Sequence, residues 1–187
     1  MANAAYEGLK LAGADVVIKR VPETVPEDVL KRVGAFEKQK EFEQIPICTQ
    51  DELPEFDGFM LLSPTRFGNM TSQMKSFLDV TGQLWFQKKL VGKPITFCTS
   101  TSSQGGGAQT TLTSMYNFAI HHGMIIVPLP YENPSMFDSE NPMVCSPYGA
   151  ATFTGTDGSR QPSEVELTIV KDQAKFLLKI AEKLAKC

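Results

Sequence analysis

The chain has 187 residues, of which 42% are hydrophobic and 21% are charged, and its formal net charge is −3. This length suits a single domain over residues 1–187 with a full core, and the composition is that of an ordinary globular protein. Nucleic acids and anionic membranes bind basic patches, whereas the lysines and arginines here are scattered among acidic residues, which argues against both partners.

Four segments have the pattern of strands. Residues 15–21 (DVVIKRV) are short and β-branched, and three later runs are apolar at nearly every position: residues 58–63 (GFMLLS), 95–100 (ITFCTS) and 124–129 (MIIVPL). Continuous apolar runs, rather than alternating ones, suit parallel strands that are buried on both faces. The stretch between residues 130 and 162 is long and irregular, which in a compact domain indicates a functional loop or a subunit contact.

Helical patterns separate these runs. After Asn69, a candidate N-cap, comes an apolar stripe at helical spacing formed by Met74, Phe77 and Leu78. Residues 111–123 (TLTSMYNFAIHHG) predict a second helix, which ends at Gly123. Ser163 and Glu166 form a capping box before the last helix, whose apolar residues recur at spacings of three and four: Leu167, Val170, Ala174, Leu177, Ala181 and Leu184.

The alternation of strands and helices predicts an α/β fold with a doubly wound parallel sheet. In such a sheet, ligands bind in the crevice outside the carboxyl ends of the strands. We expect three unusual regions to lie together at this edge: residues 63–69 (SPTRFGN), 100–109 (STSSQGGGAQ) and 121–124 (HHGM).

Each region also has an ordinary structural explanation. A glycine-rich loop can be a plain turn, Arg66 and Phe67 can be a surface ion pair and a core plug, and His121 and His122 can be favoured by the dipole at a helix end. The hydroxyls and free N–H groups of residues 100–109 also suit a polar ligand or an anion. The expected position of all three regions at one edge favours a binding site.

The cysteines lie far apart, without a CxxC pair and without a histidine at ligand spacing: Cys48, Cys98, Cys145 and Cys187. This pattern argues against a zinc site or a disulfide framework, and a reducing compartment fits it best. The longest apolar runs have five or six residues, far short of a membrane span, and the first residues lack a signal-peptide pattern. We therefore expect no metal, no integral membrane segment and a cytoplasmic location.

Several motifs, in this order, resemble those of the WrbA family of flavodoxin-like NAD(P)H:quinone oxidoreductases: PTRFGNM, STSSQGGGAQTT, HHGMIIVP, SPYGA and DGSRQPS. The resemblance runs from about Tyr6 to the end of the chain. It implies a flavodoxin-like, three-layer doubly wound sheet, FMN as cofactor, NAD(P)H as co-substrate and a small-molecule quinone as substrate. It also implies a homodimer or a homotetramer.

The resemblance assigns FMN binding to two loops. The first contains Pro64, Thr65, Arg66, Phe67, Gly68 and Asn69, and the second contains Ser100, Thr101, Ser102, Ser103, Gln104, Gly105 and Gly106. His121 maps to a histidine that contacts the flavin region and could give a proton to the reduced quinone. Trp85 resembles the aromatic residue that borders the nicotinamide or quinone, across a subunit interface.

The sequence departs from the family at its beginning. Family members open with a β-strand and a Ser-x-Tyr-Gly-His type loop, and neither is present before residue 6. Without that strand we expect residues 15–21 to lack a neighbour, residues 58–63 to show a bare sheet edge, and FMN to lose about 5–9 kcal/mol of phosphate binding. An incomplete gene and a natural truncation both fit this departure. Ser102 also replaces an expected glycine, which predicts strain if its φ is positive, and Ala108 replaces an expected glutamine.

Three functions stay open at this point. The leading hypothesis is two-electron reduction of quinones by NAD(P)H through FMN, in which the cofactor carries the chemistry and the protein orients the rings. A flavodoxin-type electron carrier is the second, although carriers need an acidic docking face that a net charge of −3 does not supply. The third is a flavin-poor structural or interaction subunit of the same fold.

Overall fold

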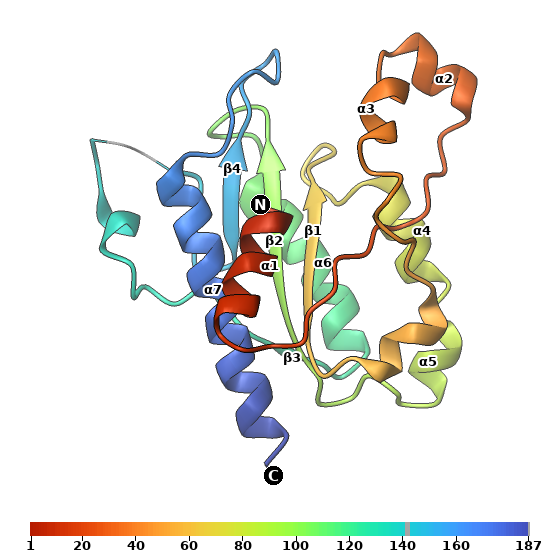
Figure 1. Cartoon of the computed structure of the whole chain (residues 1–187), viewed down its shortest axis with the longest axis vertical. Helices are drawn as coiled ribbons and strands as arrows, with labels where there is room; N and C mark the ends of the chain where they lie inside the picture. Colours follow the sequence, from red (N-terminus) through yellow and green to blue (C-terminus); the bar gives the residue numbers. More distant parts are fainter. Residues whose placement is uncertain (141–142, 187) are drawn as a thin grey trace.

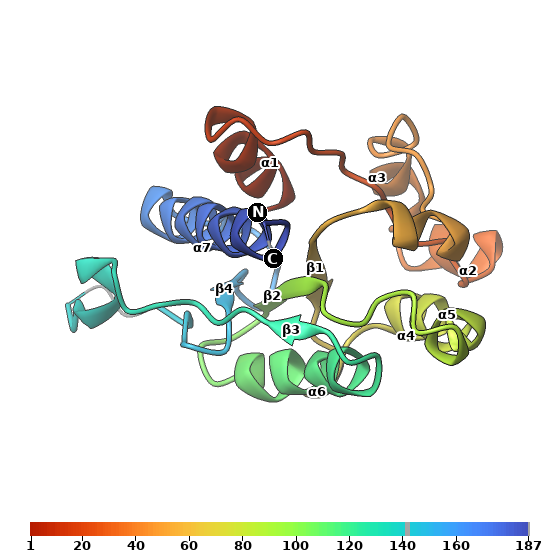
Figure 2. The same cartoon turned by 90° about the horizontal axis from the view of Figure 1, so that it is seen from below.

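The computed structural model describes residues 1–140 and 143–186, so Cys187 lies outside the described residues. Its centre is a parallel sheet of β1 (Phe59–Pro64), β2 (Pro94–Thr101), β3 (Ile125–Ile126) and β4 (Ala150–Phe153). One face is covered by α1 (Ala2–Leu11) and α7 (Glu164–Leu184), and the other by α6 (Ala108–His121), which gives the three layers seen in Figure 2. The predicted α/β class with a parallel sheet is confirmed.

The sheet is centred on β2. Its pairing with β1 runs from Phe59 opposite Ile95 to Pro64 opposite Ser100. Its other edge pairs first with β3 and then with β4, end to end. The stretch expected to be irregular therefore contains β4, together with the short 3-10 helix η2 (Pro134–Phe137).

The strand predicted over residues 124–129 is much shorter than expected. Only Ile125 and Ile126 are in ladder positions, although the main-chain N–H of Val127 still donates to the Ile95 carbonyl at 2.8 Å. Pro128 has no N–H to donate, which ends the ladder on this side of β2.

The prediction of a strand over residues 15–21 is wrong. The segment is extended, but its one ladder contact is an isolated bridge between Arg20 and Ile47. A strand needs a neighbour to satisfy its main-chain groups, and among the described residues β2 alone pairs with β1. The expectation that an N-terminal strand is missing from the centre of the sheet stays a prediction.

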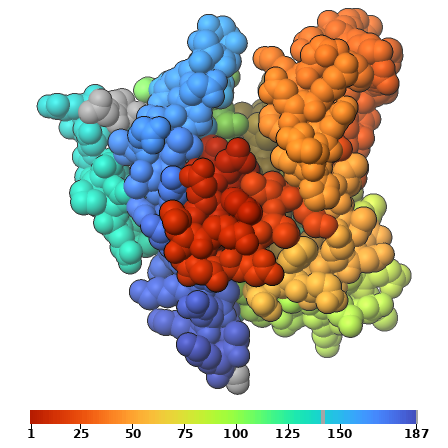
Figure 3. All heavy atoms as spheres, viewed as in Figure 1, coloured from red at the N-terminus to blue at the C-terminus, as the bar shows by residue number. Residues whose placement is uncertain are grey.

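The remaining helices flank β1. They are α2 (Glu27–Arg32), α3 (Phe36–Lys40), the 3-10 helix η1 (Gln50–Glu55), α4 (Ser72–Asp79) and α5 (Gly82–Phe86). Figure 1 shows α2 and α3 projecting beside the carboxyl end of β1, and the space-filling view shows α1 between this arm and α7 (Figure 3). Thr71, not the predicted Asn69, caps α4, because its hydroxyl accepts the Met74 N–H at 3.3 Å.

Two cores hold the layers together. On one face, side chains of α4, α5 and α6 pack on β2 around Phe97, Leu112 and Met115. On the other, α1 packs so closely on α7 that a Cβ atom on Gly8 would lie 3.0 Å from the Cα atom of Lys171. The predicted capping box of α7 is confirmed: the Ser163 hydroxyl accepts the Glu166 N–H at 3.2 Å, and Glu166 accepts the Ser163 N–H at 2.8 Å. No helix among the described residues has the length and apolar character to cross a membrane.

Candidate flavin site at the carboxyl edge of the sheet

The loop after β1 ends in a tight turn that presents an aromatic ring to solvent. Arg66 and Asn69 exchange main-chain hydrogen bonds of 2.7 and 3.0 Å, with Phe67 at φ 52° and Gly68 at φ 80° between them. A positive φ at both central residues is the geometry of a two-residue hairpin turn. The Phe67 side chain is fully exposed, at 106% of its reference area, which excludes the alternative that it is a core plug.

Gly68 is required by close packing. A Cβ atom at this position would lie 2.8 Å from Oγ1 of Thr110, and a Cβ atom on Gly107 would lie 3.1 Å from the Cα atom of Gly68. The Thr111 hydroxyl donates to the Thr65 hydroxyl at 2.7 Å. The loop after β1 is therefore seated on the first turn of α6, which holds it beside the loop after β2.

The loop after β2 is short, polar and internally bonded. The Thr101 hydroxyl donates to the Ser103 carbonyl at 2.7 Å, and the Gly106 N–H donates to the same carbonyl at 3.0 Å. The side chains of Ser102, Ser103 and Gln104 are exposed. Ser102 does not have a positive φ, so the strain expected from serine at this position is absent.

A third loop, residues 154–162, completes this edge, and none of its residues is among the site residues predicted from the sequence. The Thr154 N–H donates to the Thr101 carbonyl at 2.8 Å, so the loop continues from β4 directly beside the loop after β2. Its tip is fixed by Asp157, which accepts the Ser159 N–H at 3.0 Å; this bond and the Ser159 hydroxyl lower the pKa of the Asp157 carboxyl. The signal was present in the DGSRQPS motif.

A cavity of about 280 Å³ lies where the three strands end. Its walls carry a set of hydroxyl side chains from β1, β2, β4 and the third loop: Ser63, Thr99, Ser100, Thr152 and Thr154. The Ser63 hydroxyl accepts the Thr71 N–H at 3.0 Å, and the Thr99 hydroxyl donates to the Ser63 carbonyl at 2.8 Å. Ser63, Thr99 and Thr152 are buried and their hydroxyls are bonded within the protein. The cavity therefore presents mainly apolar surface, to which Met1, Leu62 and Pro162 contribute and which suits the face of a flat ring.

His121 does not lie at this edge, and the expectation that all three regions share it is wrong. Helix α6 starts at the carboxyl edge and runs back along the sheet for 14 residues, roughly 21 Å at 1.5 Å per residue. His121 therefore lies at the amino edge, just before β3. The loop that leads into a parallel strand always lies at the opposite edge from the loop that leaves it.

Trp85 also lies at the amino edge. It belongs to α5, which lies at the lower end of the sheet in Figure 1, and the segment after it is tied to this edge by the Gly92 N–H, which donates to the Gly123 carbonyl at 2.9 Å. Within one chain, the structure thus brings the two predicted FMN loops together and places Trp85 and His121 away from them.

His122, unlike His121, is buried, and it joins α6 to the start of α5. Its Nε2 atom lies 2.9 Å from the Thr81 hydroxyl, which itself donates to the Leu78 carbonyl at 2.7 Å. The hydroxyl must therefore accept from His122, which fixes the neutral tautomer with hydrogen on Nε2. Nδ1 has no hydrogen-bond partner among the described residues, and burial, with a smaller effect of His121, lowers the pKa of His122.

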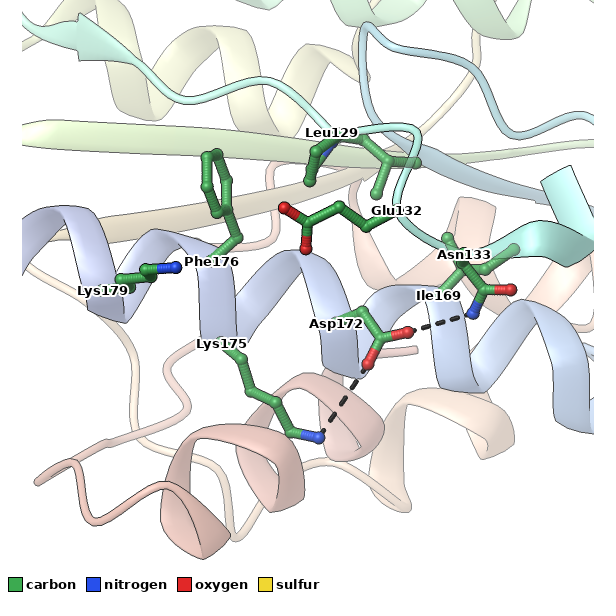
Figure 4. Close-up of a pocket in the computed structure, with 9 residues that line it drawn as sticks. Leu129, Glu132, Asn133, Ile169, Asp172, Lys175, Phe176 and Lys179 are labelled. Carbon is green, nitrogen blue, oxygen red and sulfur yellow. Dashed lines mark hydrogen bonds and ion pairs between the residues drawn. The ribbon is translucent and has the colours of Figure 1, made fainter.

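A second cavity, of about 320 Å³, lies away from this edge, between residues 129–133 and α7 (Figure 4). Leu129 and Ile169 form its apolar floor, and Glu132, Asp172, Lys175 and Lys179 supply charges that balance. Asp172 accepts from the Asn133 side chain at 3.0 Å. This cavity shares no residue with the three loops.

Residues 1–133 match the family model described as NADPH-dependent FMN reductase. The chain belongs to this family. Among its relatives, proteins named NAD(P)H dehydrogenase (quinone) from Geotalea daltonii and Geotalea uraniireducens are 48% and 46% identical to it. The first alignment covers 98% of this chain and 90% of the relative, and the second covers 100% and 92%. The expected kinship with NAD(P)H:quinone oxidoreductases is confirmed.

Solved structures confirm the flavodoxin-like fold of this FMN reductase family member. A flavodoxin, WrbA-like protein from Agrobacterium tumefaciens superposes with a TM-score of 0.51 at 20% identity, over 73% of this chain and 71% of that one. An oxidoreductase from Corynebacterium diphtheriae superposes with a TM-score of 0.53 at 14% identity, over 100% of this chain and 85% of that one.

The residues at the carboxyl edge fit the flat ring system of FMN, which the name of the family contains. Phe67 offers an exposed aromatic face, and the loop after β2 offers hydroxyls at its surface. Such a combination suits a flat ligand with polar edges. On the three loops the basic side chains are Arg66 and Arg160. Arg160 is paired with Glu166 at 3.0 Å, so Arg66 is the candidate for contact with an anionic group.

Proposed function

We propose that this chain is an FMN-dependent NAD(P)H:quinone oxidoreductase, a single domain that acts in the cytoplasm. The observation that carries the proposal is the meeting of the loops after β1, β2 and β4 at one edge of a flavodoxin-like sheet, where Phe67 is exposed and a cavity of about 280 Å³ lies at the strand ends. Ligands of doubly wound sheets bind at this edge. Relatives of 46–48% identity that carry the name NAD(P)H dehydrogenase (quinone) support the same reaction.

The protein's part in the reaction is to bind and orient. FMN, when bound, supplies the chemistry of hydride acceptance and two-electron transfer. Pro64 to Asn69 would line one side of its ring, with Phe67 packed beside it, and Ser100 to Gly106 would line the other. The hydrogen bonds that join Thr111 to Thr65 and Thr101 to Ser103 keep the two loops in place, so little order has to be gained on binding.

Trp85 and His121 would act at the flavin site of another copy of the chain. Both lie at the amino edge, where further apolar side chains are exposed: Val80, Phe86, Val91, Ile120 and Ile125. Exposed apolar groups of this kind mark interfaces. A homodimer or homotetramer that buries them could bring Trp85 to the nicotinamide or quinone and His121 to the flavin region.

The oligomer proposal is tested by sedimentation velocity on the wild-type chain and on Phe86→Lys. Phe86 is 77% exposed, so the substitution should leave the fold intact while it places a charge in the interface. We expect the wild-type chain to sediment as a dimer or tetramer and the variant to dissociate. A monomeric wild-type chain at micromolar concentration would contradict the proposal.

The catalytic proposal is tested by following NADH or NADPH oxidation after addition of FMN and benzoquinone. We expect oxidation that depends on both additions and that is weaker in Phe67→Asn, because asparagine keeps the turn but removes the ring. Oxidation that needs FMN but is not increased by quinone would indicate that the electrons pass to free FMN or to oxygen, and it would contradict quinone as the acceptor. Absence of oxidation in a folded, FMN-bound chain would contradict the proposal.

A further inference from the structure

A buried carboxylate stands behind the third loop of the site. Glu166 has no exposed surface, and its Oε2 atom accepts three hydrogen bonds: from the Ser163 N–H at 2.8 Å, the Thr152 hydroxyl at 3.0 Å and Nη1 of Arg160 at 3.0 Å. Helix α7 needs only the first of these for its cap. The other two connect the helix to β4 and to the loop that leaves it.

Arg160 holds that loop against the end of β4. Its Nη1 atom also donates to the Phe153 carbonyl at 2.8 Å and to the Thr152 hydroxyl at 3.2 Å, and its guanidinium stacks on the Phe153 ring at 3.9 Å. The Arg160 N–H donates to the Thr154 carbonyl at 2.9 Å. The loop is thus closed on itself and fixed at its base by one ion pair.

The same contacts reach the loop after β2. Beside Phe153, Thr154 donates its N–H to the Thr101 carbonyl at 2.8 Å, and the Thr101 hydroxyl donates to the Ser103 carbonyl at 2.7 Å. Loss of the ion pair would release the base of the third loop, then the Thr101 contact, and then the turn at Ser103. That turn belongs to the predicted FMN loop.

The arrangement is costly for a purely structural feature. The Oε1 atom of Glu166 is buried without a hydrogen-bond partner among the described residues, and an unsatisfied buried polar atom destabilises a fold. An apolar side chain could fill the same space without that cost. A carboxylate at this position is explained if the exact position of the loops matters more than stability.

We propose that Glu166 and Arg160 are positioning residues of the flavin site, which fix the loop after β4 and, through Thr101, the shape of the Ser100–Gly106 loop. The inference rests on the proposed function for its cofactor. Neither residue needs to touch FMN, because they act through the loop that does.

The test is Glu166→Gln, with Glu164→Gln as the matched control. Glutamine keeps the length and can still accept from Ser163, but it removes the charge that holds Arg160. Glu164 lies in the same turn of α7 and is exposed. In fluorescence quenching we expect Glu166→Gln to raise the Kd for FMN by about tenfold, the effect of one lost charge-assisted contact, and Glu164→Gln to leave it unchanged.

A second readout does not depend on FMN. Amide hydrogen exchange in the cofactor-free chain should become faster at Thr154 and Gly106 in Glu166→Gln, while amides in the middle of β2 keep their wild-type rates. If Glu166→Gln does not fold, Arg160→Lys provides the same comparison, because lysine keeps the charge but loses the stacking on Phe153.

The outcomes separate the two proposals. Unchanged exchange at Thr154 and Gly106 would overturn the positioning role, whatever the affinity for FMN. Faster exchange with an unchanged Kd would also overturn it, because the loops would then move without effect on the cofactor. A wild-type chain that does not bind FMN would contradict the proposed function, while faster exchange in Glu166→Gln would still support the control of loop shape by Glu166.

Discussion

At the scale of single residues, the site depends on backbone conformations that the sequence only partly reveals. The PTRFGN motif indicated a special loop, but its turn could not be placed from residue types, because phenylalanine is rarely found at positive φ. The structure places both Phe67 and Gly68 there. The N-cap of α4 is Thr71, two residues after the predicted Asn69. Asparagine and threonine are both good caps, and only the path of the chain decides between them.

Gly68→Ala should destabilise the chain by about 1–2 kcal/mol, because alanine is strained at positive φ and its Cβ atom would lie 2.8 Å from Oγ1 of Thr110. Urea unfolding measures the change. Gly82→Ala is the control, since no atom lies within 4 Å of its added Cβ and its φ is not positive. Equal stability of the two variants would contradict the described packing of the turn.

His122 predicts a loss of stability in mild acid. Burial lowers its pKa in the folded chain below the ordinary value of 6.5, so below that pH the unfolded chain binds a proton that the folded chain does not. Unfolding free energy should therefore decrease as the pH falls from 6.5 through the lowered folded pKa. His122→Gln, which can still donate to Thr81, should have a weaker dependence in urea titrations between about pH 5 and 7. The same slope in both proteins would contradict the assignment.

At the scale of elements, α7 is the most predictable part of the chain, but the burial of one of its residues, Gln173, is not predicted. Its capping box and apolar repeat follow directly from the sequence, because local hydrogen bonds and helical spacing determine them. Gln173 is polar and so does not belong to that apolar repeat, yet it is fully buried. Its place between Val170 and Leu177, on the apolar face, was the available signal.

Gln173 stabilises the sheet where β3 has ended and β4 begins. Its side chain accepts the Ala150 N–H at 2.7 Å and donates to the Phe97 carbonyl at 3.0 Å. Gln173→Leu should cost about 2–6 kcal/mol, from two buried main-chain groups at about 1–3 kcal/mol each. Thermal and urea unfolding measure this, with the exposed Gln87→Leu as control. A loss under about 1 kcal/mol would show that these groups find other partners.

At the scale of the whole molecule, the parallel sheet and its carboxyl edge could be predicted, because buried parallel strands have a distinctive apolar pattern. Two features could not be predicted. Residues 15–21 have strand-forming side chains but no neighbour to pair with, and the edge of β2 opposite β1 is shared by β3 and the later strand β4. Both depend on contacts between distant segments, which composition and spacing do not encode. The position of His121 at the amino edge follows instead from the chain order, because His121 lies in the segment that leads into β3.

The central claim is that the carboxyl edge of this sheet binds FMN, and the most direct measurement is an FMN titration of the 187-residue chain by flavin fluorescence quenching. The account predicts saturable binding with a Kd of about 1 μM or below, a free energy of about −8 kcal/mol or better. Binding of this strength requires that other groups, with Arg66 as the candidate, replace the phosphate contacts whose loss the sequence predicts. It also predicts clearly weaker binding by Phe67→Asn. Absence of binding up to about 1 mM FMN, in a chain shown to be folded by circular dichroism, would contradict it.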